Sequence, residues 1–128
     1  MARKRSATLT DAELRLMDVL WRMGHATVAE VNAALAPPPL AYNTVLTTLR
    51  ILERKGYVAH DADGRAFVYR ALLARDDAAK RAVGNLVQRF FRNSPGALAL
   101  RLVADERPSD DELRRLRSLI ERYEEDLR

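Results

Sequence analysis

The sequence predicts a mainly α-helical protein that carries one small β-hairpin. Apolar residues recur at the spacing of an amphipathic helix in three segments before residue 56 and again after residue 75. Between these segments, the pair Asp63-Gly64 separates two runs rich in Val, Tyr and Phe, which is typical of a hairpin turn. With 128 residues, the chain has the length of one average domain with an extension.

The first helix is expected from about Asp11 to Met23. It should begin with a capping box, because the side chains of Thr10 and Glu13 can each accept a hydrogen bond from the free backbone N–H of the other residue. Gly24 is expected to end it. The residues predicted for its buried stripe are Leu14, Met17, Leu20 and Trp21.

Two further helices are expected before the hairpin. The second should follow Thr27, whose side chain can cap it, and should stop at "APPPL" because proline lacks the backbone N–H. The third should run from about Tyr42 to Lys55. The inward residues predicted for these helices are Val28, Val31 and Leu35, then Tyr42, Val45, Leu49 and Leu52.

Two antiparallel strands are expected in "YVAHDADGRAFVYRAL", after Gly56. The order helix, helix, helix, hairpin is that of a winged helix-turn-helix, in which a β-ribbon follows the third helix. We therefore expect a basic tail over residues 1–8, a winged-helix domain over residues 9–72 and a helical region over residues 73–128.

The C-terminal region should contain several helices. One stripe of apolar residues at helical spacing precedes the breaker Ser94-Pro95-Gly96, and a short apolar helix is expected at "ALALRLV". The last helix should open with a capping box of Ser109 and Glu112. The first stripe comprises Ala79, Val83, Leu86 and Phe90, and the heptad a and d positions of the last helix are Leu113, Leu116, Ile120, Tyr123 and Leu127.

The polar face of the third helix indicates DNA binding. Asn43, Thr47, Arg50 and Arg54 share it, and Asn and Thr suit base edges in the major groove. Glu53 is the single acid between residues 40 and 58. Such a scarcity of acids is expected on a surface that lies beside phosphates, because phosphates repel carboxylates. The alternative is a solvated face, but such faces usually mix Glu and Lys. The residues expected at the DNA are Tyr42; Asn43, Thr44, Leu46 and Thr47 at the bases; and Thr48, Arg50, Lys55 and Arg65 at the backbone.

Two basic elements outside the third helix could also reach DNA. Arg65 follows the hairpin turn, where it could contact a phosphate or the minor groove, although a solvated turn arginine is the alternative. The tail residues Arg3, Lys4 and Arg5 could touch the backbone or have no function. Residues 1–72 hold 10 basic and 7 acidic side chains, and residues 73–128 hold 12 and 11, so the first part is the more basic.

Other classes of function are disfavoured. The chain has no cysteine, and His25 and His60 lie in no ligand-spaced cluster, so neither a metal site nor a disulfide is predicted. No phosphate-binding loop, nucleophile elbow or paired-carboxylate pattern is present, so no enzyme and no cofactor is expected. No apolar run approaches the roughly 18 residues of a membrane span, and we expect a soluble, cytoplasmic protein without membrane insertion.

The segments "LTDAELRLMDVLW", "TVAEV", "AYNTVLTTLRILERKGYV" and "GRAFVYRAL" resemble, in order and spacing, the penicillinase-repressor family, the BlaI/MecI/CopY type of winged-helix regulators. The resemblance covers about Leu9 to Glu124 and is most specific from Ala41 to Val58. It implies a bacterial repressor that binds a dyad-symmetric DNA operator as a homodimer and dimerises through its C-terminal helices. The residues expected in the dimer are Phe90, Leu98, Leu102, Leu113, Leu116, Ile120 and Tyr123.

The chain departs from two branches of that family. The copper-responsive branch carries a C-terminal cysteine cluster, which this chain lacks. In the β-lactam-responsive branch, a membrane sensor-protease triggers cleavage at an Asn-Phe bond, and the matching position here is Arg101-Leu102. Either a related protease of altered preference cuts at Arg101-Leu102, or release from DNA is not proteolytic and follows the binding of a ligand or partner. Two alternative functions stay open: a ligand-sensing regulator with a pocket between its two parts, and a winged helix used as a protein-interaction module.

Overall fold

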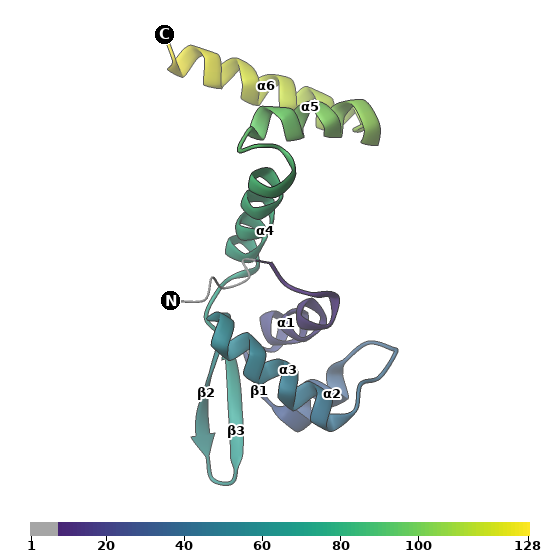
Figure 1. Cartoon of the computed structure of the whole chain (residues 1–128), viewed down its shortest axis with the longest axis vertical. Helices are drawn as coiled ribbons and strands as arrows, with labels where there is room; N and C mark the ends of the chain where they lie inside the picture. The colour runs from purple at the N-terminus through teal and green to yellow at the C-terminus, as the bar shows by residue number, and fades with distance from the viewer. Residues whose placement is uncertain (1–7) are drawn as a thin grey trace. The chain divides into compact units, whose positions relative to one another are not determined.

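A computed structural model describes residues 8–128, so the expected tail contacts of Arg3, Lys4 and Arg5 lie outside the described residues. The chain divides into two compact units, Met1–Asn85 and Leu86–Arg128. Within the described residues, no helix has the length and apolar character that a membrane span requires. In chain order the elements are α1 (Asp11–Met23), β1 (His25–Thr27), α2 (Val28–Ala34), α3 (Tyr42–Lys55), β2 (Val58–Asp63), β3 (Ala66–Ala71), α4 (Arg75–Phe90), α5 (Pro95–Glu106) and α6 (Asp110–Asp126) (Figure 1).

Helix α1 has the predicted bounds and the predicted capping box. The Thr10 N–H donates to Glu13 Oε1 at 2.8 Å, and the Glu13 N–H donates to Thr10 Oγ1 at 3.2 Å. The predicted burial of Leu14 was wrong, because its side chain is 42% exposed. Helix α1 contacts α2, α3 and the sheet, so its buried face is centred away from Leu14. The buried apolar residues of α1 are Leu16, Met17, Val19 and Leu20.

Helices α2 and α3 follow the predicted pattern with one exception. Thr27 caps α2 in a box with Glu30. In α3, the inward residues Val45 and Leu49 are fully buried, as is Leu52. The expected burial of Tyr42 was wrong, since its side chain is 50% exposed in the first turn of α3, beyond the edge of the core.

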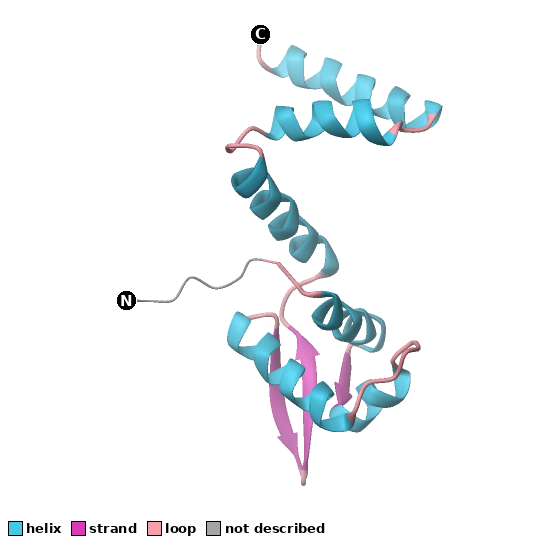
Figure 2. Cartoon of the chain, turned by 45° about the vertical axis from the view of Figure 1, so that its right-hand side comes forward, coloured by secondary structure: helices cyan, strands magenta, loops and turns pink. Residues whose placement is uncertain are grey.

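The hairpin is confirmed, and it belongs to a larger sheet than predicted. Strand β3 pairs antiparallel with β2 on one side and with β1 on the other. Strand β1 has three residues, too few to give a sequence signal, and its Ala26 pairs with Tyr69. Figure 2 shows α3 crossing in front of this sheet, while the outer end of the β2–β3 hairpin projects beyond the helices. The whole β2–β3 hairpin is called the wing below.

The wing has a buried base and an exposed outer part. Tyr57, Val58 and Tyr69 are buried in the core that the three helices share with the sheet. All residues from Asp61 to Phe67 are exposed. Gly64 adopts φ +63°, the left-handed conformation that the hairpin turn requires.

The second unit contains helices α5 and α6, which run side by side in opposite directions (Figures 1 and 2). Helix α5 is longer than the predicted "ALALRLV", because Ser94 caps it and Pro95 occupies its first position. The predicted capping box of Ser109 and Glu112 opens α6. Neither helix buries a single residue in the isolated chain, although both carry many apolar side chains.

Candidate nucleic-acid interface

The outer face of α3 is polar and solvent-exposed, as predicted. Asn43, Thr44, Thr47, Arg50 and Arg54 are all exposed, on the side opposite the buried core residues of the helix. The first turn of α3 contains no acid, and its N-cap residue makes no side-chain hydrogen bond to the helix. The first N–H groups of a helix lack acceptors within the helix, and a first turn without acids favours a nearby anion.

Two residues expected at the DNA backbone have partners within the protein. Thr48 is only 8% exposed, and its hydroxyl donates to the carbonyl of Thr44 at 2.7 Å. Lys55 places its Nζ 2.8 Å from Oε1 of Glu13 in α1. Leu46, expected at the bases, is half-buried beside the core. The exposed surface of α3 thus lacks the side chains of Thr48 and Lys55 in this conformation.

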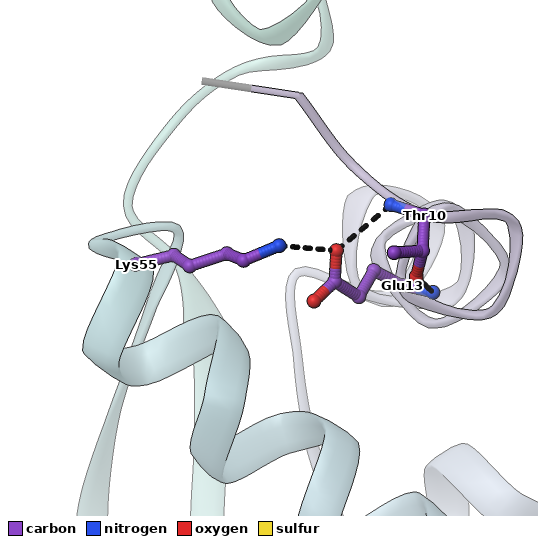
Figure 3. Close-up of polar contacts among 3 residues, drawn as sticks. All are labelled: Thr10, Glu13 and Lys55. Carbon is purple, nitrogen blue, oxygen red and sulfur yellow. Dashed lines mark hydrogen bonds and ion pairs between the residues drawn. The ribbon is translucent and has the colours of Figure 1, made fainter. Parts of the chain in front are cut away.

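The Glu13 carboxylate joins the start of α1 to the end of α3 (Figure 3). Its side chain is 5% exposed, and that of Lys55 is 17% exposed. Burial raises the pKa of Glu13, but the hydrogen bonds from Lys55 and Thr10 outweigh burial, so the pKa lies below its ordinary value. Glu13 is therefore a charged group whose Oε1 accepts from both Thr10 and Lys55, and it links α3 to α1.

The wing carries a further basic side chain at its tip. Arg65 lies in the exposed turn at the wing tip, as predicted. Phe67, two residues further along the chain, is the second residue of the return strand β3 and is 44% exposed. Both side chains are thus available to a partner molecule.

A cavity of about 650 Å³ lies between α3 and the wing. Across it, the His60 Nδ1 lies 2.6 Å from Oε1 of Glu53, so that the ring N–H donates to the carboxylate. Sequence reasoning missed this pair: Glu53 stood out as the single acid of an acid-poor helix, but nothing local indicated that His60 was its partner. The lining residues are Thr47, Arg50, Glu53, Arg54 and His60.

In the second unit, a groove of about 560 Å³ separates α5 from α6 and is lined on both sides by leucines. Of the residues expected in a dimer, Leu98 and Leu116 are half-buried, and the others are exposed. The pair Arg101-Leu102 lies inside α5, where Nη1 of Arg101 is 3.8 Å from Oδ2 of Asp105. The exposed members of the expected dimer set are Phe90, Leu102, Leu113, Ile120 and Tyr123.

Comparison with known proteins gives a consistent result. The family model described as penicillinase repressor matches residues 9–122. The chain is 26% identical over 121 residues to the penicillinase repressor of Bacillus licheniformis, covering 94% of each chain. It is 23% identical over 116 residues to the methicillin resistance regulatory protein MecI of Staphylococcus aureus, covering 88% of this chain and 92% of that one. The solution structure of the DNA-binding domain of the repressor BlaI is 32% identical, with a TM-score of 0.51, covering 59% of this chain and 93% of that one.

Proposed function

Because the chain belongs to the penicillinase repressor family, whose members are transcriptional repressors with a winged-helix DNA-binding domain and not enzymes, we propose that it represses transcription by binding a dyad-symmetric operator as a homodimer. The observation that carries this proposal is the exposed, acid-poor face of α3. Its acceptors and donors suit base edges, and its arginines suit phosphates. The protein would act in the bacterial cytoplasm, where its operator lies.

The exposed residues of α3 divide into two roles. Asn43 and Thr47 contact base edges in the major groove, with Tyr42 and Thr44 beside them in the first turn. Arg50 and the wing-tip Arg65 contact phosphates on either side. Leu46 packs near a thymine methyl, whereas Thr48 and Lys55 support the helix from behind through their contacts with Thr44 and Glu13.

The second unit supports the homodimer. One winged helix reads too few base pairs for useful specificity, so two copies must be joined. Helices α5 and α6 expose an apolar surface that one chain leaves uncovered, and a second copy would bury it. The apolar residues at the a and d positions of α6 supply the stripe that pairs two copies of this helix.

Release from the operator would follow cleavage within α5 by a protease under the control of a membrane sensor. A cut in α5 separates α6 from the DNA-binding unit while leaving every residue of α3 intact. The bond at Arg101-Leu102 is the position that matches the family's cleavage site, and a protease that accepts Arg and Leu is required there.

Selection from a random-sequence duplex library tests this function. The purified protein should enrich a sequence with two inverted half-sites about one helical turn apart, or a multiple of it. Affinity for the enriched duplex should fall steeply with salt and exceed that for a scrambled duplex by at least about 10³. Enrichment of no sequence, together with salt-independent binding, would favour a protein-interaction module instead.

A further inference from the structure

The Glu53–His60 hydrogen bond connects the recognition surface of α3 directly to the wing. Glu53 lies in the last turns of α3, and His60 is the third residue of β2. The imidazole is held on its other sides by aromatic rings, with centroids 4.7 Å from Phe67 and 5.3 Å from Tyr69. The ring of His60 is therefore fixed in orientation before any DNA is bound.

The position of this pair matters because it lies at the boundary between the buried base and the exposed outer part of the wing. Val58, nearer the base of the wing, and Tyr69, which pairs directly with His60, are buried, whereas every residue from 61 to 67 is exposed. A two-stranded ribbon without a hydrophobic face is marginally stable by itself. The direction of the outer wing therefore depends on contacts at its root, and the Glu53–His60 bond is such a contact.

The charge of Glu53 needs an explanation if α3 faces DNA. A carboxylate on that surface is repelled by phosphates and lowers affinity for every sequence. Within residues 8–128, the side-chain hydrogen bond of Glu53 is with His60 and not with the neighbouring Arg50 or Arg54. The hydrogen bond to the wing is therefore the contact that explains why a carboxylate is present at position 53, although it lowers DNA affinity.

We propose that Glu53 and His60 are positioning residues that fix the wing against α3, so that the contact of Arg65 with DNA depends on this pair. The inference rests on the proposed function, since it assigns to the wing a contact with the same operator. His60 is separated from the turn by three residues, which at the rise of a strand is about 10 Å. Coupling between His60 and Arg65 must therefore pass through the direction of the wing.

A double-mutant cycle tests the dependence. The affinities of wild type, His60→Ala, Arg65→Ala and the double variant are measured on the duplex that the wild-type protein selects from the random library. Arg65→Ala should weaken binding about fivefold in the wild-type background. In the His60→Ala background, the same substitution should weaken binding less than about twofold. Substitutions this far apart that share no partner are additive within about a factor of two, so equal losses in both backgrounds overturn the proposal.

Two matched variants separate positioning from a general loss of structure. Asp61 lies on the opposite face of the same strand, where it pairs with Arg70 at 3.4 Å. In the Asp61→Asn background, Arg65→Ala should still weaken binding about fivefold. If Asp61→Asn reduces the effect of Arg65→Ala as much as His60→Ala does, the assignment to His60 is overturned. His60→Gln keeps a hydrogen-bond donor for Glu53. In this background, Arg65→Ala should again weaken binding by nearly as much as in wild type.

Hydrogen exchange of the free protein provides a measurement without DNA. Backbone amides of residues 61–67 should exchange faster in His60→Ala than in wild type or Asp61→Asn, while core amides of α1 stay equally protected. Equal exchange in all three proteins overturns the positioning role. If the wild-type protein selects no duplex, the proposed function fails, and the exchange result alone decides whether the pair positions the wing.

Discussion

The Nζ of Lys55, the last residue of α3, lies 2.8 Å from Oε1 of Glu13 in the first turn of α1. The same carboxylate oxygen accepts the backbone N–H of Thr10, so one atom caps α1 and tethers α3 (Figure 3). Such a buried charge is stable only while both partners are present. The placement of α3 therefore depends on a residue at the start of a different helix.

Glu13→Gln should lower the free energy of unfolding by about 1 to 2 kcal/mol, because Gln retains the cap acceptor but loses the ion pair with Lys55. Chemical denaturation at pH 7 measures this difference. Glu30→Gln is the matched control, since Glu30 has the same role in the capping box of α2 without a lysine partner. A loss for Glu13→Gln no larger than that for Glu30→Gln would contradict the role of Lys55.

The contribution of Glu13 should disappear in acid. Its pKa in the folded protein is lowered from an ordinary value near 4.5. The stabilisation is therefore fully present above about pH 5 and is lost as pH falls through the folded pKa. Denaturation curves at pH 6 and at pH 3 should show the gap between wild type and Glu13→Gln narrowing in acid. If this difference in the free energy of unfolding is the same at both pH values, the charge of the Glu13 carboxylate does not stabilise the fold.

Thr47→Ala should weaken binding to the selected operator by about 1 to 3 kcal/mol while hardly changing binding to random duplex, because a base contact carries sequence information. Fluorescence anisotropy on both duplexes measures the two affinities. Equal losses on operator and random DNA would remove Thr47 from the base contacts.

Arg50→Ala should show the reverse behaviour. A phosphate contact contributes equally to all sequences, so affinity should fall on operator and random duplex alike. The slope of log affinity against log salt concentration should decrease by about 1. An unchanged slope would indicate that Arg50 touches no phosphate.

Replacing Leu116 and Ile120 with Glu should yield folded monomers with weak operator affinity, because two charges per chain would be placed in the apolar stripe of α6. Sedimentation equilibrium measures the mass, and circular dichroism checks the helices. Arg122→Glu changes the net charge equally on the opposite side of α6 and should remain dimeric. A monomeric wild-type protein at operator-binding concentrations would contradict the homodimer.

A cut between Pro95 and Pro108 should reduce operator affinity by about 10² to 10⁴, because it frees the DNA-binding unit from the tether that makes the second contact intramolecular. A specific protease site placed in the loop between α5 and α6 permits this comparison on one sample before and after cutting. Mass spectrometry of the protein from derepressed cells then identifies the natural event. An intact chain during full derepression would exclude proteolysis.

Sequence reasoning succeeded where the signal is local. The capping boxes at Thr10 and Ser109 and the hairpin turn at Gly64 involve residues within four positions of one another, so the chain around them largely determines the outcome. The polar face of α3 was also predictable, because the period of a helix assigns each residue to a side.

Sequence reasoning failed where segments far apart in the chain determine the burial or the partner of a residue. Leu14 and Tyr42 fit a helical stripe, yet they are exposed because the neighbouring elements do not extend over them. Strand β1 exists only through its pairing with β3, more than 40 residues away in the chain. The partners of Lys55 and His60 could not be predicted, since no local rule links α3 to the start of α1 or to the inner face of the wing.

The helical state of Arg101-Leu102 has a kinetic consequence. A protease cleft accepts an extended segment, so the bond within α5 becomes a substrate only when that helix opens locally. A lone chain buries no residue of α5 and would open it easily, whereas a partner that covers the same surface would hold it closed. In the proposed dimer, copies without a partner would then be cut before paired copies, and the time that the protein spends on its operator would depend on how often the two copies dissociate.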